Sequence, residues 1–239
     1  MILYRIYQVL IMIPLVVVIT VITATVTIIG SALGMGRTWG YYPAVCWARL
    51  FCWLSFVTVS VRGRENIRRG TSYVFVANHQ GAYDIFSIYG WLGHNFRWMM
   101  KKSLEKIPFV GYSCRCSGQI FVDNSSPSAI RQTMEAAEKQ LATGMSVVVF
   151  PEGSRTLTGR MGRFKRGAYT LAVEFGLPVV PITIDGAYHV MRRTALLPRP
   201  GHITLTIHRP IEAGDSGHDL QQLMSLSRQA IASALPGEE

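Results

Sequence analysis

Acidic residues are scarce in this sequence. Fourteen Asp and Glu stand against 24 Lys and Arg, which gives a formal net charge of +10. A basic balance of this size predicts polyanionic partners, such as nucleic acid, an anionic membrane or phosphorylated molecules. Five cations fall within the acid-free segment 155–166, and a second basic cluster lies at 62–69. Neither cluster is interleaved with aromatic residues on a recognisable nucleic-acid module, so we expect no nucleic-acid partner.

Cysteine is also rare, and the four residues present are badly spaced for metal binding. Cys46, Cys52, Cys114 and Cys116 do not form a zinc pattern, so we expect reduced thiols and no metal site. Linkers, repeats and low-complexity segments are missing too. The length after residue 60 is therefore expected to form one well-buried domain.

Charge is absent from the whole stretch Ile6–Gly36. Its apolar length is enough to cross about 30 Å of hydrocarbon. The apolar region of a signal peptide is only about 7–15 residues, so this segment is too long for one. A second apolar stretch, 41–56, carries one Arg and several aromatics, which suits a helix at the membrane interface. The sequence predicts membrane-embedded helices over residues 1–60.

How these helices meet the bilayer stays open at this point. They could cross it, or form a hairpin that enters one leaflet, with bends at Pro14 and within Gly30–Gly36. The positive charge at 62–69 predicts that the following domain, 61–239, faces the cytoplasm, at the inner (cytoplasmic) membrane.

Beyond residue 60, apolar strand patterns alternate with helical ones. Strands are predicted near 72–77, 119–122, 146–150, 178–184 and 202–208, and helices at 84–92, 127–142, 166–175 and from Asp219 to Leu235. This alternation predicts an α/β fold with a mostly parallel sheet flanked by helices.

Polar, glycine-containing sequence follows two of these strands directly. Asn78-His79-Gln80-Gly81-Ala82-Tyr83-Asp84 comes after the first, and Phe150-Pro151-Glu152-Gly153-Ser154-Arg155 after the strand near 146–150. Ligand chemistry in open α/β sheets gathers at the carboxyl ends of strands, so the two segments are expected to meet in one cleft.

The spacing of His79 and Asp84 excludes one continuous helix, which would place the two side chains about 140° apart. If His79 lies in the turn after the strand and Asp84 in the first turn of the next helix, the carboxylate can hold one imidazole nitrogen. The other nitrogen then serves as a base. The remaining histidines, His94, His189, His202, His208 and His218, have no partner pattern and are expected to be structural or exposed.

Four sequence blocks together resemble the glycerolipid acyltransferase family, in its bacterial type that acts on lysophosphatidic acid. They are the His79–Asp84 motif, the region from Lys101-Lys102 through Ile107-Pro108-Phe109-Val110-Gly111 to Asp123, the block Phe150–Arg155, and Val180-Pro181-Ile182. The resemblance implies transfer of a fatty acyl group to the sn-2 hydroxyl of 1-acylglycerol 3-phosphate, which gives phosphatidic acid.

Residue roles follow from the same resemblance. It implies that His79 is the general base and Asp84 its orienting partner, while Lys101, Glu152, Gly153, Ser154 and Arg155 bind substrate. Arg155 and Lys101 suit a phosphate, and backbone N–H groups near Gly153 could stabilise an oxyanion. Two positions depart from the family pattern: Asn124 replaces a usual arginine and Ser103 a usual glutamate. The first removes one candidate phosphate contact.

Several alternatives stay open from the sequence. The partners implied are lysophosphatidic acid, a phospholipid membrane, and acyl-CoA or acyl carrier protein as donor, with no further cofactor; neither the donor nor the acceptor lyso-lipid is decided. A metal-dependent hydrolase using His79 and Asp84 as ligands would need further ligands, and only Glu152 is at hand. A non-catalytic lipid-binding scaffold would not need a histidine–carboxylate pair.

Overall fold

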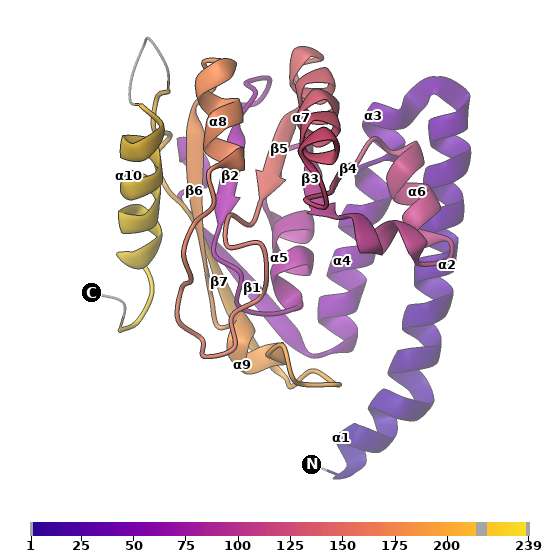
Figure 1. The fold of residues 1–239 in the computed structure, drawn as a ribbon. Coiled ribbons are helices and arrows are strands. Elements are labelled where there is room, and N and C mark those ends of the chain that lie inside the picture. Colours follow the sequence, from indigo (N-terminus) through magenta and orange to yellow (C-terminus); the bar gives the residue numbers. More distant parts are fainter. Residues whose placement is uncertain (1, 214–218, 238–239) are drawn as a thin grey trace.

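A seven-stranded sheet forms the centre of the computed structural model, which describes residues 2–213 and 219–237 (Figure 1). The strands are β1 (Val57–Arg62), β2 (Val74–Ala77), β3 (Phe96–Lys101), β4 (Ile120–Val122), β5 (Ser146–Val149), β6 (Val179–Asp185) and β7 (Gly201–Ile207). Their order is β1-β7-β6-β2-β5-β3-β4, and neighbours are parallel except for the β6–β7 pair. The prediction of a mostly parallel α/β sheet is confirmed.

Helices precede the sheet and connect its strands. The first group is α1 (Ile2–Tyr7), η1 (Gln8–Met12), α2 (Ile13–Gly30), η2 (Ser31–Met35), α3 (Gly36–Trp39) and α4 (Tyr42–Leu54). The second group is η3 (Arg64–Asn66), α5 (Tyr83–Trp91), η4 (Lys102–Lys106), α6 (Val110–Cys116), α7 (Pro127–Ala142), α8 (Gly167–Glu174), α9 (Ala187–Met191) and α10 (Leu220–Ala232). The four helices predicted from the sequence correspond to α5, α7, α8 and α10.

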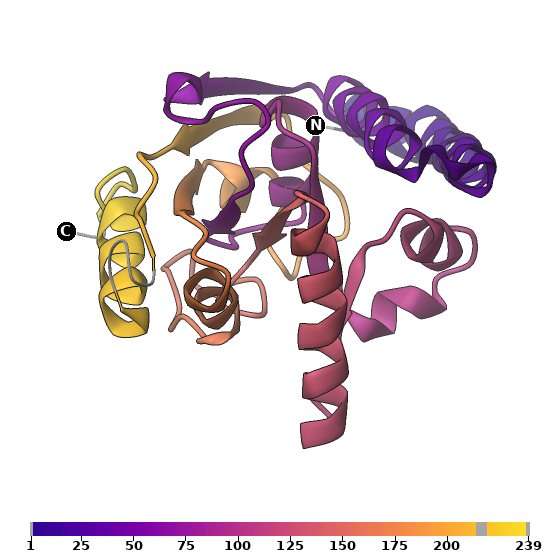
Figure 2. The same cartoon turned by 90° about the horizontal axis from the view of Figure 1, so that it is seen from above.

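Both faces of the sheet are covered, as the continuous apolar strands require. All four residues of β2 are buried, and their side chains alternate between two cores. Val74 and Val76 pack with residues of α7, α8 and α10. Phe75 and Ala77 pack with residues of α4 and α5 on the opposite face (Figures 1 and 2). The helices thereby fix the ends of β2 and β5, where the polar segments begin.

Strands β1 and β3 were not predicted. β1 follows an apolar helix after two residues, so its alternating sequence was read as part of the amino-terminal region. β3 carries charges at Arg97 and Lys101, which interrupt its apolar run. β1 pairs along its whole length with β7 and so runs across residue 60, where the sequence placed the start of the second domain.

The amino-terminal helices form one long apolar run. Residues Ile2–Trp39 are long and apolar enough to cross a membrane, and only 11% of the most apolar window is buried. The bend expected within Gly30–Gly36 lies at Gly34, whose φ of 80° is left-handed. The run packs beside α4, where the Trp47 indole donates to Thr20 Oγ1 at 2.9 Å.

Helix α4 belongs to the core of the domain as well as to the apolar region. Its Ala48 and Cys52 are fully buried in the core that α4 shares with α5 and the sheet. The single arginine of the segment, Arg49, donates from Nε to the Gly90 carbonyl at 2.8 Å near the end of α5. The charge is therefore satisfied at a helix carboxyl end, where a cation is favourable.

Candidate active site

The polar segment after β2 is fixed to the sheet by Asn78. Its side-chain amide donates to the Ile184 carbonyl at 2.9 Å, and its side-chain oxygen accepts the Ile184 N–H at 2.8 Å. Asn78 is 1% exposed, so this pair of bonds continues the β2–β6 ladder by one residue in the interior. The position of the next residue, His79, is thereby set by the sheet.

His79 and Asp84 meet as their spacing predicted. His79 lies in the turn and Asp84 in the first turn of α5, and the distance from Nδ1 to Oδ2 is 2.7 Å. The same oxygen accepts the Gly81 N–H at 2.9 Å, so the proton of the short bond belongs to the imidazole. Asp84 is fully buried, whereas the His79 side chain is 14% exposed. Nε2 is then the unprotonated nitrogen, available to accept a proton from a bound molecule.

Gly81 makes the turn between them possible through close packing. A Cβ at this position would lie 2.6 Å from the Ala187 carbonyl oxygen and 2.7 Å from that of Met191. Any side chain would push the turn away from α9. Glycine is therefore required here because another segment of backbone occupies the space.

Stacking of aromatic rings holds the imidazole plane. The His79 and Phe150 rings are 3.9 Å apart at an interplanar angle of 6°, and Phe150 in turn stacks on Trp98 at 5.2 Å. Sequence reasoning missed this role of Phe150 and Trp98. Phe150 opens one of the four family blocks, but nothing in its sequence position shows that its ring would face His79.

Glu152 acts on the backbone of the site. Oε1 accepts the His79 N–H at 2.8 Å, and Oε2 accepts the Gly162 N–H at 2.7 Å. Burial raises the pKa of this carboxyl group, although the two backbone N–H bonds oppose the rise. Within the described residues, no ion pair joins it to Arg155. Glu152 instead fastens the turn after β5 and the loop at 162 to the backbone of His79.

The turn Gly153–Arg155 differs in one respect from expectation. The Gly153 N–H, an expected oxyanion donor, instead donates to the Phe150 carbonyl at 2.9 Å. Gly153 has a φ of 75°, which explains the glycine. Ser154 and Arg155 follow it, both half-buried. In the described part of the chain the Arg155 guanidinium has no hydrogen-bond or ion-pair partner, so it is free to bind an anion.

Two lysines add to the charge at this edge. Lys101 is the last residue of β3, three residues beyond the Trp98–Val148 pair that ends the β3–β5 ladder. Lys101 is exposed, while its neighbour Lys102 is paired with Asp123 at 2.8 Å. Lys165 was not singled out from the sequence, yet a Cβ at Gly153 would lie 2.7 Å from its Nζ.

Three of the other histidines form hydrogen bonds within the domain. His94 bonds to Ser146 Oγ at 2.9 Å, and burial lowers its pKa. His202 bonds through both ring nitrogens to Thr58 and Ser60, and His208 bonds to Thr183. His189 is exposed, and His218 lies outside the described residues. No group of three or more His, Cys, Asp or Glu side chains that could hold a metal is found across 2–213 and 219–237.

Comparison with known proteins shows the family of this chain. The family model described as Acyltransferase matches residues 58–185. A 1-acyl-sn-glycerol-3-phosphate acyltransferase of Chlamydomonas reinhardtii is 34% identical over 187 residues, which is 77% of this chain and 54% of that protein. The enzyme of the same name from Pseudomonas aeruginosa is 32% identical over 176 residues, or 72% of this chain and 67% of that protein. The chain spans about half the length of the algal relative and of the chloroplastic enzyme LPAT1 of Arabidopsis thaliana, to which it is 30% identical over 201 residues (83% of this chain, 55% of that protein).

A solved structure shares the fold. The crystal structure of the 1-acyl-sn-glycerophosphate acyltransferase PlsC from Thermotoga maritima matches with a TM-score of 0.74 and 28% identity. The match covers 91% of this chain and 92% of that one. The resemblance drawn from four short sequence blocks is confirmed, and the chain belongs to the acyltransferase family.

Proposed function

We propose that this protein transfers a fatty acyl group from an acyl thioester to the sn-2 hydroxyl of 1-acylglycerol 3-phosphate, giving phosphatidic acid for phospholipid synthesis. The observation that carries the proposal is the 2.7 Å bond between His79 and the buried Asp84, in a chain that belongs to the acyltransferase family. Relatives and a structural neighbour named for this reaction support the choice of acceptor.

The reaction uses His79 as a general base and needs no enzyme nucleophile. Nε2 takes the proton of the acceptor hydroxyl as its oxygen attacks the thioester carbonyl, while Asp84 stabilises the imidazolium that forms. The tetrahedral intermediate collapses, the C–S bond breaks, and the new C–O ester bond remains. The proton then passes from Nε2 to the departing thiolate. The step balances without a further cofactor.

The acceptor phosphate is assigned to the cationic edge beside this base. Arg155 can bind it through the two-pronged guanidinium, and Lys101 and Lys165 add point charges near the same turn. Ser154 completes this part of the binding site, and Gly153 shapes the turn that carries it. Glu152 supports it from behind, through its bonds to the two backbone segments.

The amino-terminal helices favour entry into one leaflet over crossing. One end is tied to the domain by Gln8, whose amide donates to the Pro198 carbonyl at 2.8 Å. The other end is tied by Asn95, which donates to the Arg37 carbonyl at 2.8 Å, and by Arg97, which donates to that of Gly36 at 3.0 Å. With both ends attached, the apolar run lies along the domain (Figure 1). A crossing helix would carry the domain into the bilayer with it, so we place the exposed face of this run in one leaflet.

The compartment and the domain division follow as parts of the same proposal. Residues 1–60 supply the membrane-anchoring helices and 61–239 the catalytic domain, with β1 as the strand that joins the two. The basic cluster at 62–69 supports a catalytic domain on the cytoplasmic side of the inner membrane.

Replacement of residues on the exposed face of α2 should release the protein from membranes. Val18 and Ile22 are 53% and 56% exposed and lie one helical turn apart. The double variant Val18→Asp/Ile22→Asp should shift most of the protein to the soluble fraction, since each charge at the centre of an apolar helix costs about 2.5–3.5 kcal/mol in the bilayer. Sedimentation with vesicles after a high-salt wash measures this, with Val18→Ala/Ile22→Ala as the matched control. A double Asp variant that still sediments fully would assign the anchor to α4.

Loss of Arg155 should weaken binding of the acceptor and leave binding of the donor unchanged. Arg155→Ala should raise the KM for lysophosphatidic acid about 10- to 100-fold, because hydrogen bonds to a charged group are worth about 1.5–3 kcal/mol. Arg155→Lys should recover part of the loss, since an ammonium cannot make the two-pronged contact. Lys101→Ala should act in the same direction. Initial rates at varied acceptor and donor concentrations separate the two KM values, and an equal rise in both would remove Arg155 from the phosphate site.

The proposal as a whole is tested with a panel of acceptors and donors. Purified protein in lipid nanodiscs is offered lysophosphatidic acid, other lysophospholipids and a lyso-aminolipid, each with labelled acyl-CoA or acyl carrier protein. Lysophosphatidic acid should be used at least tenfold better than the others. Equal use of an acceptor without a terminal phosphate would overturn the assignment of the acceptor.

A further inference from the structure

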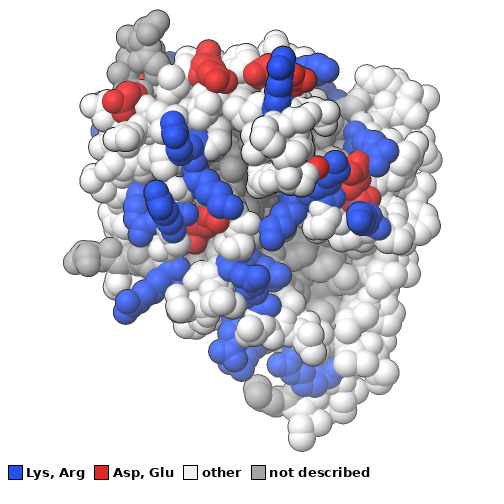
Figure 3. All heavy atoms as spheres, in the orientation of Figure 1, with Lys and Arg blue, Asp and Glu red and all other residues white. Residues whose placement is uncertain are grey.

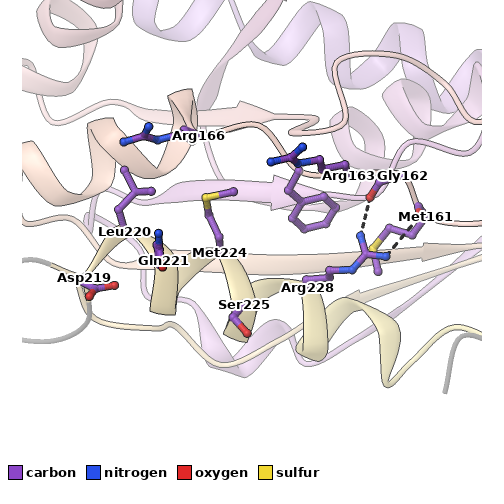
Figure 4. Close-up of a pocket in the computed structure, with 11 residues that line it drawn as sticks. Met161, Gly162, Arg163, Arg166, Asp219, Leu220, Gln221, Met224, Ser225 and Arg228 are labelled. Carbon is purple, nitrogen blue, oxygen red and sulfur yellow. Dashed lines mark hydrogen bonds between the residues drawn. The ribbon is translucent and has the colours of Figure 1, made fainter.

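A basic groove lies between the loop 161–166 and helix α10, apart from the histidine site. Its volume is about 1020 Å³, and it is open along one side. In Figure 4, Arg163 and Arg166 extend from the loop, and Leu220 and Met224 from α10 below it. None of these residues belongs to the His79–Asp84 pair or to the proposed phosphate site of lysophosphatidic acid.

The two loop arginines are available for a ligand. Both are exposed, and neither guanidinium has a hydrogen-bond or ion-pair partner within residues 2–213 and 219–237. They stand in the acid-free segment 155–166. Figure 3, in the orientation of Figure 1, shows Lys and Arg atoms outnumbering Asp and Glu atoms on this face. Three arginines and one acidic residue, Asp219, line the groove, so its balance of charge suits an anion.

A third arginine, Arg228, fastens the loop 161–166 to α10. Arg228 of α10 donates to the Gly162 carbonyl and, at 3.4 Å, to the Met161 carbonyl, as the dashed lines in Figure 4 show. Its guanidinium also lies 5.6 Å from the centroid of the Phe164 ring. The wall that carries Arg163 and Arg166 is thus fastened to α10, so the groove is formed before a ligand arrives.

The groove is connected to the base by a single carboxylate. Gly162, on its rim, donates to Glu152 Oε2 at 2.7 Å, and Oε1 of the same side chain accepts the His79 N–H at 2.8 Å. The two carboxylate oxygens of Glu152 thus bridge the rim of the groove and the backbone of His79.

We propose that this groove binds the phosphorylated nucleotide of coenzyme A and so makes acyl-CoA the donor, an inference that rests on the proposed acyl transfer. The two free arginines match its phosphates, and the apolar side chains of Leu220 and Met224 offer surface to the adenine and the pantetheine arm. A concave site of about the size that small molecules and cofactors use, roughly 300–1,000 Å³, fits a nucleotide. A carrier protein would instead need a contact surface of about 800 Å² on each partner.

The test compares donors that differ only in the nucleotide. Initial rates are measured with an acyl-CoA and with the acyl thioester of pantetheine, which has the same reacting group but no phosphate. In Arg163→Ala/Arg166→Ala, the ratio of kcat/KM for acyl-CoA to that for the pantetheine thioester should fall about 10- to 100-fold. Arg131→Ala, which removes an exposed arginine of α7 paired with Glu135, is the matched control and should keep the wild-type ratio.

Four outcomes are decisive. An unchanged ratio in the double variant overturns the proposal. A fall in the rate with acyl carrier protein alone, with the acyl-CoA ratio intact, also overturns it and assigns the groove to a protein carrier. Binding of free coenzyme A to the His79→Ala protein, followed by calorimetry, needs no turnover: the same double substitution should weaken it at least tenfold. If the wild type transfers from no donor, the proposed function fails, and the calorimetry still decides the role of the groove.

Discussion

His79→Ala should lose acyl transfer by about 100- to 10,000-fold, the usual worth of a positioned general base. The side chain supplies the only atom assigned to accept the hydroxyl proton, and its ring contributes little to the core because it is partly exposed and stacks on one face only. The protein should therefore stay folded and membrane-bound. Single-turnover rates with saturating lysophosphatidic acid and donor measure the chemical step.

The matched control for this variant is His189→Ala, which removes an exposed histidine from α9. It should retain nearly full activity, and both variants should keep the wild-type melting temperature within a few degrees, about the shift that 1 kcal/mol causes. A turnover rate of His79→Ala within tenfold of the wild-type rate would contradict the proposed mechanism.

Asp84→Asn should be the second most damaging change, with a fall in kcat of about 100- to 10,000-fold. Oδ2 of Asp84 accepts N–H bonds from both His79 and Gly81, and the aspartate is fully buried. An amide placed there can turn its NH₂ toward Nδ1, which selects the wrong imidazole tautomer. It also withdraws the anion that stabilises the imidazolium during transfer.

Thermal unfolding separates this role from simple loss of structure. Asp84→Asn should keep the wild-type melting temperature within a few degrees, about the shift that 1 kcal/mol causes, while kcat falls. A fall in kcat that comes with a much larger loss of melting temperature would argue against Asp84 as the orienting partner of His79.

The sequence by itself determined the pair that carries the chemistry, because the pair is local. His79 and Asp84 are five residues apart, and one strand, one turn and the first turn of one helix are enough to bring them together. The mostly parallel sheet and the long apolar amino terminus were likewise readable, since both depend on runs of residue types rather than on contacts. The helix over Asp219–Leu235 followed from its apolar spacing, and in the structure Asp219 caps it.

Only the tertiary structure decided what surrounds the pair. Phe150 and Glu152 lie more than seventy residues from His79, and their roles depend on the β2–β5 register and on side-chain direction. Strand β3 was not predicted because Arg97 and Lys101 interrupt its apolar sequence. The strand is stabilised by pairing with β4 on one side and β5 on the other. The groove beneath Arg163 exists only because α10 returns to pack against the loop that Glu152 holds. Such features depend on contacts between segments that are distant in the sequence. Local sequence patterns do not show which distant segments will pack together.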